Sequence, residues 1–378
     1  MRSPHQLIAV LGVGALLTLT GCGNVRSAGE ALTADAAKID GYDWKAAPDT
    51  SKITAQGTEL TTYGLSEDWA GYGEVMRAFC AAHKAACFHS NVKLPTLEQI
   101  QKFDAEQRDP VGTISDIGLP WGRVAEAKGV VPGYLPPSAR RLKDWQRGKE
   151  GGWVATFAGS VAFVVNTTKV KHPPKKWADL LKPEYKGMIG APDPRRTGIG
   201  QYMVIAAALA NGGGIDDPGP GYDFFARLKR TGNLSTAKLN KITLRSGEAP
   251  IQIDYDFSGI AQRAKARTYK IKVVVPADGS IWAPSGLMIN KYNIAKGDFL
   301  KGFLGYVLED KAQRAFARAG AHPIRYLNGD LKLPPAARRN WLPARSYAPV
   351  RQIDVTRIDP ARIGRDWESR VLVQGGPA

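Results

Sequence analysis

The hydrophobic and polar positions follow a helical period in some stretches and form unbroken apolar runs in others. Apolar side chains recur every three or four residues over 66–83 and over 96–107, which predicts two amphipathic helices. The short stretches 59–64 and 113–120 predict strands before the first helix and after the second. Strands and helices that alternate in this order predict an α/β fold with a mostly parallel sheet and helices on both faces.

Two long uncharged runs interrupt this alternation. Residues 153–166 and 282–290 are largely apolar, which is typical of strands buried on both faces. The stretch between them has strand and helix patterns of its own. A chain that leaves one lobe, builds a second and returns forms two lobes joined by two crossings. The cleft between such lobes is where ligands usually bind.

The N-terminus carries an export pattern. The uncharged apolar run over 7–19 is shorter than the roughly 20 residues that a membrane-spanning helix needs, so it predicts a secretory signal over 1–21. The run ends in LTGC, which resembles the bacterial lipobox and predicts acylation of Cys22. An ordinary signal peptide with an incidental cysteine is the alternative. The polar, Ala- and Gly-rich residues 22–57 then form a tether that holds the folded part away from the membrane.

Two further cysteines, Cys80 and Cys87, lie seven residues apart. An exported chain meets oxidising conditions that favour a disulfide between them. Seven helical steps would place the two Cα atoms about 10 Å apart, which is too far for a disulfide. Pairing therefore requires the helix to end between them, and two unpaired buried thiols are the alternative.

Length and charge limit the class of protein. The chain has 378 residues, of which 43% are hydrophobic, so it holds one large or two medium domains beyond the signal and the tether. Its formal net charge of +17 is spread along the whole sequence without a dense basic block. Nucleic-acid binding is a poor fit for such a chain, because no recognition motif accompanies the charge. An anionic ligand or an anionic surface fits better.

Sequence signatures of enzymes are missing. The five histidines are isolated, and the sequence contains no HExxH, CxxC or Walker A motif. We therefore predict a protein that is not an enzyme, with no catalytic residue, no metal and no cofactor. The alternative from a different class is a secreted hydrolase with Asp254 and Asp256 as paired carboxylates. Two positions apart on one strand, these carboxylates are too similarly placed to divide acid and base roles.

Candidate ligand contacts lie where predicted strands end and helices begin, because helix N-termini offer unpaired amide donors and a partial positive charge. Four such junctions carry suitable side chains: 66–69, 116–121, 195–200 and 254–258. The candidate contacts are Ser66, Asp68, Trp69, Trp121, Arg195, Arg196, Thr197, Tyr255, Asp256 and Trp282.

The loop RRTG at 195–198 has the chemistry of an anion site, because guanidinium groups, a hydroxyl and backbone amides can converge on a phosphate, phosphonate or carboxylate. The alternative is a solvated turn. Tyr255 or Asp256 contributes an aromatic wall or a carboxylate, unless the aspartates cap the following helix. Ser66 and Asp68 have the same capping alternative. The tryptophans either stack on the ligand or belong to the core.

Several stretches together resemble the extracellular solute-binding proteins of ATP-driven importers, in the branch of ferric-iron, polyamine, phosphosugar and aminoethylphosphonate binders. They are TYGLSEDWAGYG, SDIGLPWGRVAEAKGVVPGY, WVATFAGSVAFVVN, WADLLKPEYKGMIGAPDP, IAAALANGGG and APSGLMINKYNIAKGDFLKGFLGYVLEDKAQRAFARAG. Their order and spacing over most of 58–325 carry the resemblance. The iron-binding relatives hold the metal with adjacent tyrosines, and this chain has no such pair.

The resemblance implies a two-lobed, type II periplasmic-binding-protein-like α/β fold with a ligand cleft between hinge strands. Lobe 1 would comprise 58–155 and 283–378, including a helical C-terminal extension, and lobe 2 would comprise 156–282. The implied function is capture of a small anionic or zwitterionic solute and its delivery to a membrane permease with ATP-binding subunits. Polyamine or ferric-iron binding is the alternative within the class. We expect a periplasmic or cell-surface monomer that is lipid-anchored and does not bind nucleic acid.

Overall fold

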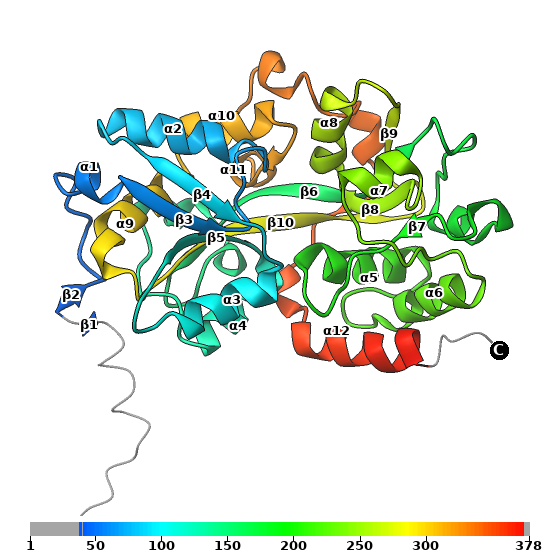
Figure 1. Ribbon diagram of the computed structural model, residues 1–378, viewed down its shortest axis with the longest axis horizontal. Coiled ribbons are helices and arrows are strands. Elements are labelled where there is room, and N and C mark those ends of the chain that lie inside the picture. The colour runs from blue at the N-terminus through cyan, green and yellow to red at the C-terminus, as the bar shows by residue number, and fades with distance from the viewer. Residues whose placement is uncertain (1–37, 40, 374–378) are drawn as a thin grey trace, which may run out of the picture. The chain divides into compact units, whose positions relative to one another are not determined.

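A computed structural model describes residues 38, 39 and 41–373, and the predicted signal and Cys22 lie outside these residues. The described chain is built on a ten-stranded sheet with the order β4-β3-β5-β10-β6-β8-β7, to which β9 and β11 add on β6 and β12 adds on β10 (Figure 1). Its strands are β3 (Glu59–Tyr63), β4 (Phe88–Val92), β5 (Gly112–Gly118), β6 (Trp153–Asn166), β7 (Ile189–Gly190), β8 (Ile251–Tyr255), β9 (Ile271–Val274), β10 (Ser280–Ile289), β11 (His322–Pro323) and β12 (Val350–Arg351). A separate hairpin pairs β1 (Lys38–Ile39) with β2 (Tyr42–Asp43).

Helices cover both faces of the sheet (Figure 1). The α-helices are α1 (Ile53–Gln56), α2 (Tyr72–Ala82), α3 (Thr96–Ala105), α4 (Gly122–Ala127), α5 (Gly198–Ala210), α6 (Gly219–Arg230), α7 (Lys241–Ser246), α8 (Asp256–Lys265), α9 (Gly297–Tyr306), α10 (Asp310–Arg318), α11 (Ile324–Leu327) and α12 (Pro360–Trp367). Short helical turns that matter below are η2 (Leu119–Trp121), η8 (Pro335–Arg338), η10 (Val355–Arg357) and η11 (Glu368–Val373).

The strands β6 and β10 run antiparallel through the middle of the sheet and join its two ends. Every residue of β6 is buried, as expected for a strand with apolar neighbours on both faces. On one side of this pair lie β3, β4 and β5 with α2, α3, α9 and α10, which we call the first half. On the other side lie β7, β8 and β9 with α5 to α8, which we call the second half.

The prediction of a mostly parallel sheet was right at the ends and wrong in the middle. β3 pairs in parallel with β4 and β5, and β7 pairs in parallel with β8. The pairs β10–β5, β10–β6, β6–β8 and β6–β9 are antiparallel. The reason is that β6 and β10 each cross from one half to the other in opposite directions, so they cannot run parallel to each other.

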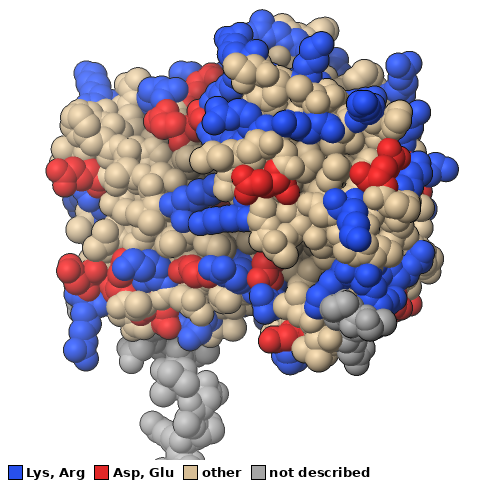
Figure 2. All heavy atoms as spheres, turned by 45° about the vertical axis from the view of Figure 1, so that its right-hand side comes forward, with Lys and Arg blue, Asp and Glu red and all other residues tan. Residues whose placement is uncertain are grey.

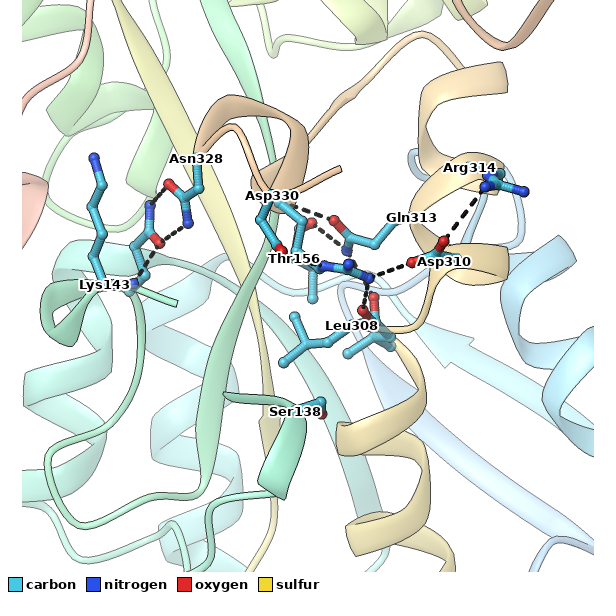
Figure 3. Close-up of polar contacts among 12 residues, drawn as sticks. Ser138, Lys143, Thr156, Leu308, Asp310, Gln313, Arg314, Asn328 and Asp330 are labelled. Atoms are coloured by element: carbon cyan, nitrogen blue, oxygen red, sulfur yellow. Dashed lines mark hydrogen bonds and ion pairs between the residues drawn. The ribbon is translucent and has the colours of Figure 1, made fainter. Parts of the chain in front are cut away.

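The chain after β11 contacts both halves. Its start is fixed by Arg325, which is buried and donates to the Leu308 carbonyl at 2.9 Å and to Asp310 and Asp330 at 2.7 Å each (Figure 3). Gln313 of α10 donates to the Thr156 carbonyl of β6 at 3.0 Å in the same region (Figure 3). Further along, η8 packs on α10, η10 packs on η2, and η11 packs on α6. These contacts make 324–373 a segment that passes over both halves.

The helix α2 begins later than its sequence suggested. Ser66 does not cap it, because the chain turns between Ser66 and Tyr72 and the N-cap is Gly71 in the left-handed region at φ 89°. The helix ends at Ala82, between Cys80 and Cys87, and the two cysteines form a disulfide with a Cα–Cα distance of 6.0 Å. No helix in the described part of the chain is both long enough and apolar enough to cross a membrane.

Candidate functional site

Three of the predicted strand-to-helix junctions meet between the two halves. The indole Nε1 of Trp69, in the loop after β3, donates to Oδ1 of Asp116 on β5 at 2.8 Å. The same indole packs edge-on against Tyr255 at the end of β8 and against Phe257 of α8, with ring centroids 5.7 and 5.1 Å apart. Tyr255 and Phe257 stack on each other at 5.1 Å. The arrangement is a carboxylate with aromatic rings from both halves around it.

Asp116 is the electrostatic centre of this group. Its side chain is only 7% exposed, and its Oδ2 has no hydrogen-bond partner among the described residues. Burial raises its pKa well above the ordinary carboxylate value, against the opposing effects of the Trp69 indole and, more weakly, the nearby Ser285 and Tyr72 hydroxyls. A buried carboxylate oxygen without a donor costs free energy until a donor arrives. The site can therefore accept a hydrogen-bond donor, and a cationic donor most strongly.

The helix α5 meets the first half directly at this junction. Gly118 and Gly198 lie so close that a Cβ on either would be 2.7 Å from the Cα of the other. One turn into α5, the buried Tyr202 hydroxyl accepts the Leu119 amide at 2.9 Å and donates to the Pro284 carbonyl of β10 at 2.7 Å. The halves are thus in contact at the base of the candidate site.

The structure places the two arginines of the predicted anion loop on different partners. Arg195 pairs with Asp193 of its own loop at 2.8 Å, and this hydrogen-bonded carboxylate raises the pKa of the Arg195 guanidinium. Arg196 instead reaches Glu98 on α3 of the first half, with Nε donating to Oε1 at 2.6 Å. Thr197 is the N-cap of α5, where its hydroxyl oxygen accepts the Gly200 amide at 3.2 Å. Each of the three side chains is already engaged within the chain.

The loop after β3 also forms its contacts within the chain. Ser66 is exposed and its carbonyl accepts the Trp69 amide. Asp68 pairs with Lys265, the last residue of α8, at 2.7 Å, and this hydrogen-bonded ammonium lowers the pKa of Asp68. Of this loop, only Trp69 lies against Asp116.

Asp256 and Trp282 lie on the side of the sheet where the C-terminal segment packs. The fully buried Asp256 accepts the Ser160 amide at 2.8 Å and the Tyr347 hydroxyl at 2.9 Å. Trp282 stacks on Tyr347 with ring centroids 5.4 Å apart. Asp254 takes a different direction and accepts the Ser258 hydroxyl at 2.7 Å, so neither aspartate caps the backbone of α8.

Trp121, in η2, is buried and belongs to the main hydrophobic core. Its indole Nε1 has no partner among the described residues. The turn η10 of the C-terminal segment packs on η2, which also contacts α4, α5 and β10. Trp121 is therefore enclosed between the site and that segment.

Sequence reasoning missed the partners of these side chains. Glu98, Lys265 and Tyr347 were not candidates, although each now binds or packs against one of them. Only one such contact had a local signal. Asp193 stands two residues before Arg195, a spacing at which an aspartate readily pairs within its own turn.

Neither the pockets nor the surface charge of the described chain indicates a second candidate site. Two pockets of 370 and 430 Å³ in the described chain lie elsewhere, beside Leu234–Ala237 and beside Phe88–Ser90. Within the described residues no cluster of His, Cys, Asp and Glu could hold a metal ion. On the face seen in Figure 2, lysine and arginine are spread widely with acidic residues between them, in agreement with the scattered net charge of +17.

Known structures share this fold. The periplasmic binding protein AfuA from Actinobacillus pleuropneumoniae, with fructose-6-phosphate bound, superposes with a TM-score of 0.66 over 84% of this chain and 99% of its own, at 18% identity. The periplasmic binding protein P5PA gives 0.66 over 83% and 99%, at 20% identity. Iron-bound HitA from Pseudomonas aeruginosa gives 0.61 over 83% and 99%, at 18% identity. Among curated protein sequences, none matches this chain.

The family described as bacterial extracellular solute-binding protein matches residues 121–347, which is more than half of the chain. Its members and the structural neighbours are binding proteins rather than enzymes. The two-lobed fold inferred from the sequence is therefore confirmed, with its ends joined by β6 and β10. The chain belongs to the bacterial extracellular solute-binding proteins, and it has the two-lobed type II periplasmic binding fold of ABC transporter components.

Proposed function

We propose that this protein captures a small zwitterionic solute between its two halves and delivers it to an ABC importer. The observation that carries the proposal is the buried Asp116, whose Oδ2 has no donor while aromatic rings from both halves surround it. An ammonium group would supply that donor and a full opposite charge. The proposal places the amino end of the solute at Asp116.

The anionic end fits the first turn of α5. The amides of Gly198 and Ile199 open this thirteen-residue helix, so they lack intrahelical carbonyl partners and carry the positive end of its dipole. Gly198 lies against Gly118, two residues from Asp116, so a small solute could reach both features when the halves part. The phosphosugar bound by AfuA supports an anionic group in such a cleft.

The other ligand classes have less support. Polyamine binding would use several free carboxylates, but Asp68 is paired with Lys265 and Asp254 accepts Ser258. Iron would need a cluster of anionic ligands, and the described residues contain no group of three or more His, Cys, Asp or Glu side chains that could hold a metal ion. A hydrolase with Asp254 and Asp256 is not supported, because these side chains take unrelated partners.

The proposed cellular location and partners come from the sequence analysis. Acylation at Cys22 would hold the protein at the membrane, and closure of the two halves would enclose the solute. A permease with its ATP-binding subunits would then receive it from a monomer that needs no cofactor. Palmitate labelling of cells that express the chain or its Cys22→Ser variant tests the anchor.

The experiment that tests the ligand is calorimetry with three matched probes. 2-Aminoethylphosphonate carries both charges, ethylphosphonate only the anion and putrescine only amines. We expect binding of the zwitterion alone, lost in Asp116→Asn and kept in the control Asp109→Asn, which changes an exposed aspartate of the first half. Equal binding of ethylphosphonate, or unchanged affinity in Asp116→Asn, would overturn the assignment.

A further inference from the structure

Two ion pairs join the halves on either side of the candidate site. Glu98 of the first half meets Arg196 of the second, and Asp68 of the first half meets Lys265 of the second. We propose that these pairs are latches that position the halves in the closed state and make retention of the solute depend on ionic strength. The inference rests on the proposed function and assigns Arg196 and Asp68 to closure instead of ligand contact.

The first latch has both a side-chain and a backbone part. Arg196 Nε donates to Glu98 Oε1 at 2.6 Å, and the Leu97 amide donates to the Arg196 carbonyl at 3.2 Å. The residue after Glu98, Gln99, accepts the hydroxyl of Ser115, which precedes Asp116 in β5. The residue after Arg196 is the α5 cap. Breaking this pair therefore acts on elements next to both proposed subsites.

The second latch lies beside the aromatic part of the site. Lys265 Nζ is 2.7 Å from Asp68 Oδ2, and both side chains are 59% exposed. Asp68 directly precedes Trp69, while Lys265 ends the helix that begins next to Tyr255. Separation of Trp69 from Tyr255 and Phe257 would therefore also separate this pair.

The exposure of the side chains sets the size of the effect, since Asp68, Lys265 and Arg196 are more than half exposed and Glu98 is 27% exposed. An exposed ion pair shifts an equilibrium only about 1.4- to 5-fold, so a latch can adjust closure but cannot drive it. Screening at high salt removes most of that contribution, because the Debye length falls from about 10 Å at 0.1 M to about 3 Å at 1 M. Asp116 is buried, so salt should affect it far less.

The test measures closure without any solute. Spin labels on p-acetylphenylalanine at Lys84 and Lys272, exposed positions on the two halves, report the distance between the halves in the full chain. The variants are Glu98→Arg, Arg196→Glu, Asp68→Lys and Lys265→Asp, together with the two charge-swapped doubles. Arg77→Glu is the matched control, because Arg77 pairs with Glu67 within the first half at similar exposure.

We expect each single variant to lower the ratio of closed to open molecules about 1.4- to 5-fold and each double to restore it. Raising NaCl from about 20 mM to about 1 M should lower the closed fraction of the wild type toward that of the single variants. An unchanged distance in the single variants and in salt would overturn the latches, and so would doubles that fail to restore closure. If only the ligand proposal is wrong, the three probes will not bind in calorimetry, but the distance between the spin labels will still depend on salt.

Discussion

Gly118 on β5 and Gly198 at the start of α5 touch across the boundary between the halves, and a Cβ on either would lie 2.7 Å from the other's Cα. Neither glycine is needed for its backbone angle, because neither has a positive φ. The requirement for glycine is therefore steric. It sets how closely the second half can approach Asp116.

Substitution of Gly198 by alanine should hold the halves apart. The added methyl group must displace the Gly118 backbone, and overpacking of this kind costs about 1–3 kcal/mol. We expect the affinity for the zwitterionic probe to fall by about 5- to 150-fold, with the chain still folded. Calorimetry and circular dichroism measure the two effects.

Gly214→Ala is the control for that substitution. A Cβ at Gly214 meets only the tip of Leu209 at 3.5 Å, which is ordinary contact. This variant should bind like the wild type. If Gly198→Ala also bound like the wild type, the close approach of the halves would have no part in retaining the solute.

Tyr202→Phe should destabilise the chain. The variant leaves the Leu119 amide and the Pro284 carbonyl without the hydroxyl that now bonds both in a buried position. Each of these two unpaired buried groups should lower the free energy of unfolding by about 1–3 kcal/mol. Urea denaturation measures this, with Tyr269→Phe as a control at a partly exposed tyrosine; equal midpoints for both variants would contradict the role of the hydroxyl.

The binding of a zwitterion should release a proton. Burial raises the pKa of Asp116, so its carboxyl holds a proton to a higher pH than usual, and an ammonium group would displace that proton. Affinity should therefore rise with pH until the amine of the probe itself deprotonates. Calorimetry in buffers of different ionisation enthalpy measures the proton count, and a count of zero in the wild type would contradict an ammonium at this carboxylate.

Much of the fold was predictable because it depends on local pattern. The apolar run at 153–166 coincides with β6, and the run at 282–290 overlaps β10 at Ser280–Ile289. The junction rule also placed Trp69 and Tyr255 where they now meet, since the C-terminal ends of β3 and β8 face the same gap. A single stretch of sequence is enough to predict that a whole strand is buried and where that strand ends.

The pairing of side chains was not predictable from such patterns. Arg196 lies 98 residues from Glu98, and Asp256 lies 91 residues from Tyr347, so no local period links them. The two arginines were correctly expected to pair with anionic groups. Those groups are carboxylates of the chain itself: Asp193 of the same turn pairs with Arg195, and only the tertiary structure brings Glu98 to Arg196.

The fully buried Asp256 gives the stability of the protein a pH dependence of unusual sign for a carboxylate. Burial raises its pKa from the ordinary 3.8 to about 7, against the Ser160 and Tyr347 hydrogen bonds. Between these two values the folded chain keeps a proton that the unfolded chain has lost. Because the unfolded state then binds fewer protons, the contribution of Asp256 is complete below the lower value and is lost as pH rises toward 7.

Asp256→Asn should remove that dependence. An asparagine can still accept the Ser160 amide through its carbonyl oxygen, and it stays neutral at every pH. We expect wild-type stability to fall relative to the variant by up to about 1.4 kcal/mol per pH unit over this interval. Urea denaturation at intervals from pH 4 to about pH 7 measures the difference. Asp109→Asn, an exposed control, should follow the wild-type curve. Parallel curves for Asp256→Asn and wild type would show that the carboxyl of Asp256 is ionised across the whole interval.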